Sequence, residues 1–205
     1  MNTDSPAQPK PTKTRARLLE AARAEFSEKG LECATTRSIA ERAGCNEVTL
    51  FRHFENKQKL LSAVVQETSE EFRNFCCCSG KMSGDPFEDL LLFGKAYNGS
   101  LAQCEGMVRM LIGESSRKPT LCKELIGDVL LPFHRSISNY LEDRILAGAV
   151  RSGLNTLAFA EIFTSSLMGS FLRRASGLSI LDTETGYLPV IEFLVHGIIA
   201  APSES

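Results

Sequence analysis

The stretch TRSIAERAGCNEVTLFRHFENKQKL, residues 36–60, decides how this chain folds. Apolar residues recur with helical spacing on both sides of Gly44, which predicts two short helices joined by a turn. Glycine adopts the left-handed conformation past a helix end at little cost, so Gly44 ends the first helix, and Asn46 is a good cap for the second. We expect the two helices at about residues 35–43 and 47–54.

Two short helices joined in this way form a helix-turn-helix, a motif whose second helix enters the DNA major groove. In that second helix Leu50 and Phe54 lie four residues apart and point together toward the core, with Cys45. The other side chains point outward and carry groups that meet bases and phosphates. The same pattern occurs in helical pairs that bind no nucleic acid, so the motif alone leaves the function open.

A longer segment, from about Thr12 to Leu61, resembles the TetR family of transcriptional regulators. The likeness begins with a first helix of the type ILEAAxxLFxxxG and continues through the helix-turn-helix, at Leu18-Leu19-Glu20-Ala21-Ala22, Phe26, Gly30, Thr35-Thr36, Ile39-Ala40, Ala43-Gly44, Thr49 to Phe54, Asn56-Lys57 and Leu60-Leu61. The resemblance implies that the following residues meet DNA: Thr36, Arg37, Asn46, Glu47, Val48, Thr49, Phe51, Arg52, His53 and Lys57.

Some of these positions depart from the usual family pattern. The family often has Ser, a basic residue and a small residue at Asn46, Glu47 and Val48, and usually Tyr at Phe51. Phe51 has no hydroxyl for a phosphate, so it either packs on a sugar or is a partly buried core residue. Glu47 either accepts from a cytosine amino group or, as we favour here, is a helix-terminal charge stabilised by the macrodipole.

Basic residues gather toward the N-terminal end of the chain. Residues 1–60 hold five Lys and six Arg against eight acidic residues, a net charge of +3, whereas residues 61–205 hold twelve basic and seventeen acidic residues, a net charge of −5. Arg37 and Arg52 are the best candidates to read bases, because a guanidinium donates two hydrogen bonds to guanine; the alternative for both is phosphate contact. This charge distribution agrees with DNA binding without identifying it.

The whole chain is predicted to be all-α, with about nine helices. From Asn56 onward the apolar periodicity is helical, and no alternating run is long enough to predict a strand. Caps and helix breakers place the later helices at about residues 56–76, 86–97, 104–116, 119–147, between 153 and 177, and 187–199. With the resemblance, this order predicts a disordered arm at residues 1–11, a helix-turn-helix DNA-binding domain at 12–57 and a helical ligand-binding and dimerisation domain at 58–201.

No part of the sequence favours a membrane protein. The chain has 205 residues, 43% of them hydrophobic, which is enough for a sizeable core. Its N-terminus lacks an apolar stretch, and its longest apolar runs fall far below the roughly 18 to 20 residues that span a bilayer. We therefore expect a cytoplasmic protein without a membrane partner.

The resemblance also implies a ligand pocket within each subunit, between the fourth and eighth helices. The candidate lining residues are Phe72, Phe75, Phe93, Tyr97, Met107, Met110, Leu111, Leu130, Phe133, His134, Ile137, Phe163 and Met168. This apolar and aromatic set suits a flat or greasy effector, although core packing is the alternative for each residue. Arg109, Glu114 and His134 are polar candidates, unless Glu114 pairs with Arg117 at the surface. Residues 107–121 resemble the linkage region of the AcrR-like, efflux-regulator branch.

Two apolar stripes near the C-terminus predict a homodimer. Their residues are Phe159, Phe163, Leu167 and Phe171, followed by Leu188, Ile191, Leu194, Val195 and Ile198. The resemblance implies that these stripes pair with their symmetry mates in a four-helix bundle; the alternative is that both are internal core. A dimer with recognition helices about 34 to 36 Å apart reads both halves of a palindromic DNA operator.

The seven cysteines and three histidines predict neither a metal site nor an enzyme. No paired CxxC arrangement is present, the histidines are scattered, and no cofactor is expected. Cys33 and Cys45 are interpreted as small core residues. The run Cys76, Cys77 and Cys78 leaves thiol or soft-metal sensing open as an alternative function. A second alternative is a helical assembly protein that has lost specific DNA binding, because Glu47, Val48 and Phe51 are unusual.

Overall fold

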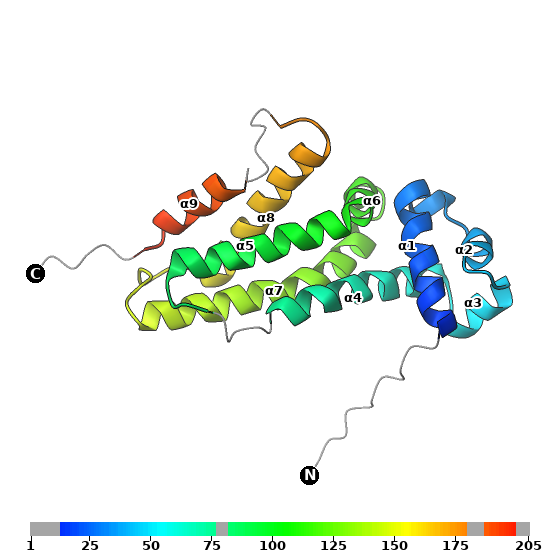
Figure 1. Ribbon diagram of the computed structural model, residues 1–205, viewed down its shortest axis with the longest axis horizontal. Helices are drawn as coiled ribbons and strands as arrows, with labels where there is room; N and C mark the ends of the chain where they lie inside the picture. Colours follow the sequence, from blue (N-terminus) through cyan, green and yellow to red (C-terminus); the bar gives the residue numbers. More distant parts are fainter. Residues whose placement is uncertain (1–12, 77–81, 180–186, 200–205) are drawn as a thin grey trace, which may run out of the picture. The chain divides into compact units, whose positions relative to one another are not determined.

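The computed structural model describes residues 13–76, 82–179 and 187–199, with only the backbone described for residues 68–76 (Figure 1). These residues form nine helices and one isolated antiparallel bridge, between Val150 and Ile199. The predicted all-α fold is confirmed. The chain divides into two compact units, Met1–Val65 and Gln66–Ser205, so the division falls inside the fourth helix, beyond the boundary expected at residue 57.

The N-terminal unit contains three helices and the beginning of a fourth: α1 (Lys13–Cys33), α2 (Thr36–Arg42), α3 (Glu47–His53) and α4 (Lys57–Cys76). Helix α2 packs against both α1 and α3. The apolar side chains that the sequence pattern places on the inner faces are buried, among them Leu18, Leu19, Phe26, Ile39, Leu50, Phe54, Leu60 and Leu61.

Local hydrogen bonds explain where the two short helices begin. The Thr35 hydroxyl accepts from the Ser38 amide at 3.0 Å, and the Ser38 hydroxyl accepts from the Thr35 amide at 3.2 Å, which is a complete capping box. The Asn46 side chain accepts from the Thr49 amide at 2.9 Å and caps α3 in the same way. The predicted helix starts are confirmed, and each helix ends one residue earlier than expected.

The turn between α2 and α3 requires glycine. Gly44 has a φ of +66°, and a Cβ atom there would lie 2.7 Å from Nη2 of Arg17. That guanidinium donates to the carbonyl oxygen of Ala43 and, at 3.1 Å, to the carbonyl oxygen of Gly44. Arg17 of α1 therefore satisfies carbonyl groups that the end of α2 leaves without helical partners.

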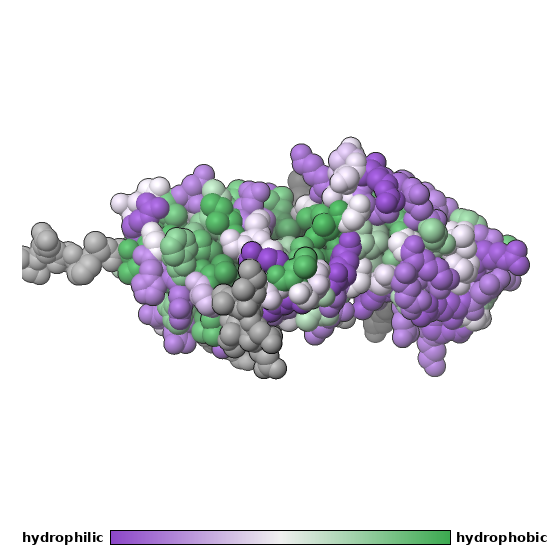
Figure 2. All heavy atoms as spheres, turned by 90° about the horizontal axis from the view of Figure 1, so that it is seen from above, coloured by the Kyte–Doolittle hydropathy of each residue, from purple (hydrophilic) through white to green (hydrophobic). Residues whose placement is uncertain are grey.

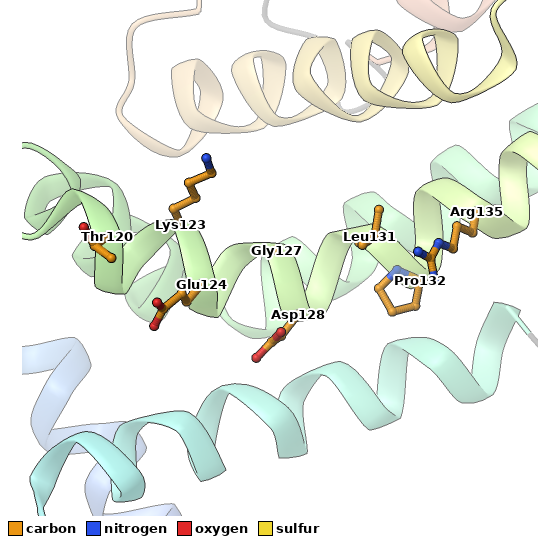
Figure 3. A pocket seen from close by; sticks show the side chains of 8 residues that line it. All are labelled: Thr120, Lys123, Glu124, Gly127, Asp128, Leu131, Pro132 and Arg135. Carbon is orange, nitrogen blue, oxygen red and sulfur yellow. The ribbon is translucent and has the colours of Figure 1, made fainter.

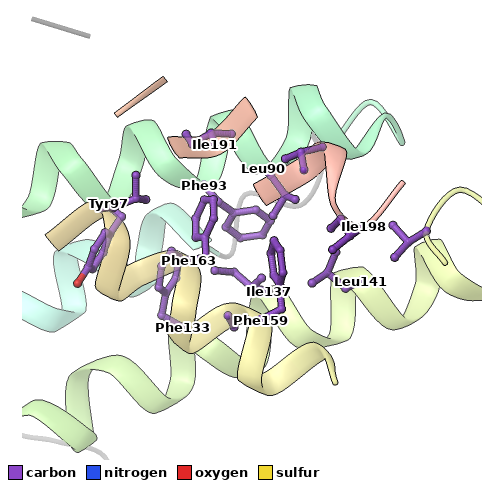
Figure 4. Packing of buried hydrophobic residues seen from close by; sticks show 14 of the residues in the cluster. Leu90, Phe93, Tyr97, Phe133, Ile137, Leu141, Phe159, Phe163, Ile191 and Ile198 are labelled. Carbon is purple, nitrogen blue, oxygen red and sulfur yellow. The ribbon is translucent and has the colours of Figure 1, made fainter. Parts of the chain in front are cut away.

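The C-terminal unit is built from five further helices: α5 (Pro86–Gln103), α6 (Glu105–Ser115), α7 (Pro119–Leu146), α8 (Thr156–Ala175) and α9 (Leu188–His196). Helix α5 contacts α6, α7, α8 and α9, and α7 also contacts α6 and α8. Figure 4 shows the aromatic core to which α5, α7, α8 and α9 contribute. Within it, the ring centroid of Phe133 lies 5.5 Å from that of Tyr97, with the two rings stacked, and 5.9 Å from that of Phe93, with the two rings edge to face.

The position of the two C-terminal stripes corrects the predicted dimer face. Seven of the predicted dimer residues are at most 6% exposed, because they belong to the core that α5, α7, α8, α9 and the segment after α9 form within one subunit: Phe159, Phe163, Leu167, Phe171, Ile191, Val195 and Ile198. Leu188 and Leu194 are partly buried. These residues form the core of one subunit, which was the alternative interpretation. On the same two helices, the exposed apolar side chains are instead Leu157, Ile162 and Phe193.

A buried carboxylate holds the segment that precedes α5. Asp89 is 2% exposed, and its oxygens accept from the amides of Ser83 at 2.7 Å and Gly84 at 2.8 Å and from the Tyr140 hydroxyl at 2.8 Å. Burial opposes ionisation of Asp89, but these hydrogen bonds outweigh it and lower its pKa. The start of α5 is thereby fixed to α7.

Helices that could cross a lipid bilayer were sought in the described ranges, and none is both long and apolar enough.

Candidate functional site

The solvent-exposed side of helix α3, in the N-terminal unit, carries both apolar and charged side chains. Val48 is 67% exposed and Phe51 is 46% exposed, so the alternative that Phe51 belongs to the core is wrong. Arg52 and His53 are also exposed. The core side of the same helix is formed by Leu50, whose side chain is fully buried. The structure therefore leaves the predicted recognition face of α3 accessible.

The first residues of α2 and α3 are joined by a hydrogen bond. The Thr36 hydroxyl donates to Oε1 of Glu47 at 2.5 Å. Both side chains are partly buried. The residues before them, Thr35 and Asn46, cap the two helices, so the Thr36–Glu47 contact is additional to the caps. This contact brings together two predicted DNA-binding residues that are eleven positions apart in the chain.

Asn46 and Thr49 are also engaged with each other. In addition to the capping bond from the Thr49 amide, the Thr49 hydroxyl donates to Oδ1 of Asn46 at 2.8 Å. The Asn46 oxygen is therefore occupied by the start of its own helix. Its amide group is the part of this side chain that is able to donate to a nucleic acid.

Arg37 lies on the exposed side of α2, paired with Glu41. Its Nε donates to Oε1 of Glu41 at 3.0 Å, and Glu41 raises the pKa of Arg37. The two side chains are 79% and 64% exposed, and a pair this exposed stabilises a protein very little. The pair therefore leaves Arg37 able to exchange Glu41 for a phosphate or a guanine. Lys57, at the start of α4, donates to the carbonyl oxygen of Glu32 at 3.4 Å.

A buried acidic residue of α1 supports α2 from beneath, and sequence reasoning missed it. Glu25 is 4% exposed, and it accepts from Lys29 at 2.7 Å, from the Ser38 hydroxyl at 2.9 Å and from Arg42 at 3.1 Å. Hydrogen bonding from Lys29, opposed by burial and reinforced by Ser38 and Arg42, lowers its pKa from 4.5 to about 2. Arg42 also forms two hydrogen bonds of 2.7 Å with Glu28. The four-residue spacing of Glu25 and Lys29 was the available sequence signal.

The predicted effector residues fall into three groups in the C-terminal unit. Seven are buried, and five of these belong to the aromatic core: Phe93, Tyr97, Phe133, Ile137 and Phe163, with Met107 and Met110 on α6. Four are partly buried: Leu111, Leu130, His134 and Met168. The predictions at Phe72 and Phe75 lie outside the described side chains. Lining of an effector pocket stays a prediction for all of them.

The polar candidates make contacts within the subunit. Arg109 donates to Glu105 at 2.8 Å, to the Ser176 hydroxyl at 3.1 Å and to the Ala175 carbonyl, so it joins α6 to the end of α8. Glu114 pairs with Arg117 at 3.4 Å, as the alternative proposed, but Glu114 itself is only 7% exposed and does not lie at the surface.

His134 joins α7 to α8. Its Nε2 lies 2.8 Å from the Thr164 hydroxyl, and that hydroxyl is 3.0 Å from the Ala160 carbonyl oxygen, to which it donates. The arrangement assigns the Nε2 proton to His134, because the Thr164 proton is already directed at the carbonyl. Burial lowers the pKa of His134.

A hollow of about 560 Å³ lies along α7, and none of the predicted pocket residues lines it (Figure 3). Its lining is Thr120, Lys123, Glu124, Gly127, Asp128, Leu131, Pro132 and Arg135. Figure 3 shows Glu124 and Asp128 pointing away from Lys123. Pro132 has no N–H for the carbonyl of Asp128 four residues earlier, so α7 offers an additional backbone acceptor beside this mixed-charge surface. Nothing in the helical periodicity indicated this hollow.

A second hollow, of about 830 Å³, lies between α8 and α9. Exposed Ile162 and Phe193 line it, together with Phe159, Leu194 and Ile198 from the predicted dimer set. Figure 2 shows hydrophobic surface gathered over the part of this unit where α8 and α9 lie. Phe193 is 81% exposed, an unusual degree for so large an apolar side chain.

The described cysteines are all free thiols, and two of them correct a prediction. Cys33 is exposed and Cys45 is partly buried, because each lies at or just beyond a helix end; neither is the small core residue that was expected. Cys122 is the buried one. The run from Cys76 to Cys78 lies outside the described side chains. Within the described residues, no cluster of three or more His, Cys, Asp or Glu could hold a metal ion.

Comparison with known proteins agrees with this geometry. Residues 18–64 match the sequence pattern of "Bacterial regulatory proteins, tetR family". The chain is 30% identical over 165 residues to the uncharacterized HTH-type transcriptional regulator YvkB of Bacillus subtilis. This alignment covers 78% of this chain and 82% of YvkB. It is 41% identical over 58 residues to the HTH-type transcriptional repressor AcnR of Corynebacterium glutamicum, covering 28% of this chain and 31% of AcnR.

A solved structure extends the likeness to nearly the whole fold. The transcriptional regulator FadR of Bacillus subtilis, solved in complex with stearoyl-CoA, aligns with a TM-score of 0.78 at 20% identity, covering 89% of this chain and 98% of that one. At this identity the comparison concerns the fold, which includes both the helix-turn-helix and the C-terminal helices.

Proposed function

This chain belongs to the TetR family of bacterial regulatory proteins, which are DNA-binding transcriptional regulators and not enzymes, and from that premise we propose that it is a repressor released by a small effector. It binds a palindromic operator as a homodimer. The observation that carries the proposal is α3, whose Val48, Phe51 and Arg52 are exposed while Leu50 is buried. A helix with this division is suited to dock its outer face in a major groove.

In the proposed complex, apolar side chains of α3 and basic side chains of α2 and α3 make different contacts with DNA. Val48 and Phe51 pack on thymine methyl groups or sugars, and Arg52 and Arg37 donate to guanine or to phosphates. Lys57 neutralises a phosphate, as its position at the start of α4 suggests. Bound protein then blocks transcription by occupying the promoter.

The homodimer is proposed to form through the hollow between α8 and α9 and its exposed rim. Replacing Phe193 by glutamate places a charge on this rim, and we expect the dimer Kd to increase at least about tenfold. Leu178→Glu is the matched control, because Leu178 is 71% exposed but lies outside the hollow. Light scattering over a concentration series measures the effect. A monomer mass for the wild-type protein at micromolar concentration would contradict the dimer.

The effector is proposed to be a small apolar or aromatic compound that binds the C-terminal unit. Support comes from the aromatic side chains of α5, α7 and α8 and the buried Met107 and Met110 of α6, and from a protein of similar fold, FadR, that was solved with stearoyl-CoA. The likeness of residues 107–121 to the efflux-regulator branch favours a compound that is also exported. A coupling free energy of roughly 1 to 3 kcal/mol between effector binding and DNA binding lowers operator affinity some 5- to 150-fold.

Selection of bound sequences from random duplex DNA at near-physiological salt tests this function. We expect the wild-type protein to enrich a palindrome, and a variant with both Arg37→Ala and Arg52→Ala to lose that enrichment. The enriched palindrome then serves as the probe for titration with fatty acyl and aromatic compounds. If folded wild-type protein enriches no sequence, the regulator is excluded in favour of a helical assembly protein.

A further inference from the structure

The contact between Thr36 and Glu47 gives the carboxylate of Glu47 a defined orientation. A negative side chain in the first turn of α3 is stabilised by the helix macrodipole wherever it points. Here, however, Oε1 is held at 2.5 Å by a hydroxyl from a different helix. The macrodipole does not explain this bond, and neither does capping, because Thr35 and Asn46 perform that role.

The second oxygen of Glu47 remains available. Among the described residues, Oε2 of Glu47 has no hydrogen-bond or ion-pair partner. Glu47 is partly buried, and after Glu41 it also contributes to raising the pKa of Arg37. An ionised carboxylate only accepts hydrogen bonds. The available oxygen therefore lies on the recognition helix as an oriented acceptor.

Among the groups that DNA presents in the major groove, the cytosine amino group suits such an acceptor best. Phosphates repel a carboxylate, and guanine and thymine present acceptors to it in the major groove. Adenine presents its amino group beside the N7 acceptor, a pair that suits an amide side chain better than a carboxylate. Cytosine presents its N4 amino group as the single donor, and carboxylates accept from it.

We propose that Glu47, oriented by Thr36, is a specificity-determining residue that selects cytosine at one position of each operator half-site. The inference rests on the proposed function, because it requires α3 to enter the major groove. Thr36 is a positioning residue in this arrangement. While its hydroxyl donates to Glu47, it does not donate to a phosphate, so its contribution is to base selection rather than to affinity for the DNA backbone.

Selection from random duplex DNA with three variants tests the assignment. The wild-type protein is expected to prefer cytosine about five- to tenfold at one position of each half-site. Glu47→Gln replaces the carboxylate by an amide and shifts that single position toward adenine. Thr36→Val leaves the Thr35 cap in place and weakens the cytosine preference while the other positions keep theirs.

Glu20→Gln is the control, since it removes the same charge from an exposed side chain of α1 that is not among the predicted DNA-binding residues. It should select the wild-type sequence. Far-UV circular dichroism verifies that each variant is folded. A Glu47→Gln protein that selects the same half-site as the wild type overturns the proposal while leaving the regulator intact. A wild-type protein that enriches no sequence overturns both.

Discussion

Gly94→Leu is expected to destabilise the C-terminal unit by about 3 kcal/mol, because α5 and α9 meet where this glycine has no side chain. A Cβ atom at Gly94 would lie 2.4 Å from Cδ1 of Ile191 and 3.5 Å from Cζ of Phe163. Both of those side chains are fully buried, so neither has solvent to move into. Leucine would force α9 away from α5. The free energy of unfolding is measured by denaturant titration with far-UV circular dichroism, as the chain has no tryptophan.

The same helix provides the control. A Cβ atom at Gly99 meets nothing within 4 Å, so Gly99→Leu should stabilise α5 by roughly 0.5 to 1 kcal/mol through helix propensity alone. The smaller change Gly94→Ala can be combined with Ile191→Val, which removes the Cδ1 atom in question. The destabilisation caused by Gly94→Ala should be about 1 kcal/mol smaller in a protein that also carries Ile191→Val. Equal stabilities for Gly94→Leu and Gly99→Leu would show that α9 does not pack on α5 at this point.

Glu25→Gln is expected to destabilise the N-terminal unit by about 2 to 3 kcal/mol at pH 7. A neutral amide accepts hydrogen bonds from Lys29 and Arg42 more weakly than the carboxylate does. Because Lys29 and Arg42 are themselves partly exposed, the loss of stability is limited. Glu20→Gln, an exposed position on the same helix, is the control and should leave stability almost unchanged.

The loss caused by Glu25→Gln should depend on pH in a defined direction. The folded-state pKa of Glu25, about 2, is below its ordinary value of 4.5, so its contribution is complete above pH 4.5 and is lost as the pH falls toward 2. The difference in unfolding free energy between wild type and variant should therefore shrink from pH 7 to pH 3. A difference that stays constant over this range would mean that the charge of Glu25 is not its source.

Helix starts were predictable because they depend on neighbours in the sequence. Thr35, Asn46 and Asp85 each accept from amides within three residues, so the chain's own order specifies the contact. Gly44 was predictable for the same reason, since its positive φ is required by the turn that it forms. The all-α fold and the exposed face of α3 follow from such local rules together with apolar periodicity.

The partners of those helices were not predictable in the same way. Periodicity identifies the apolar stripe through Phe163 and Phe171. The same spacing of apolar residues is expected whether the stripe packs within the subunit or against a second subunit, so the spacing does not distinguish the two. What decides between them is Gly94, whose missing side chain admits Ile191 from far along the chain. The Glu25–Arg42 contact and the hollow along α7 likewise depend on tertiary placement, which spacing alone does not specify.

The ion pairs around α2 also bear on how strongly this protein's affinity for DNA should depend on salt. Protein that neutralises phosphates releases the counterions condensed on DNA, and the salt dependence of binding reports how many basic groups take part. Lys29 and Arg42 already share the acidic side chains of Glu25 and Glu28. Basic residues committed in this way displace few counterions. In the proposed operator complex, the salt dependence of binding should then reflect Arg37, Arg52 and Lys57 rather than Lys29 and Arg42.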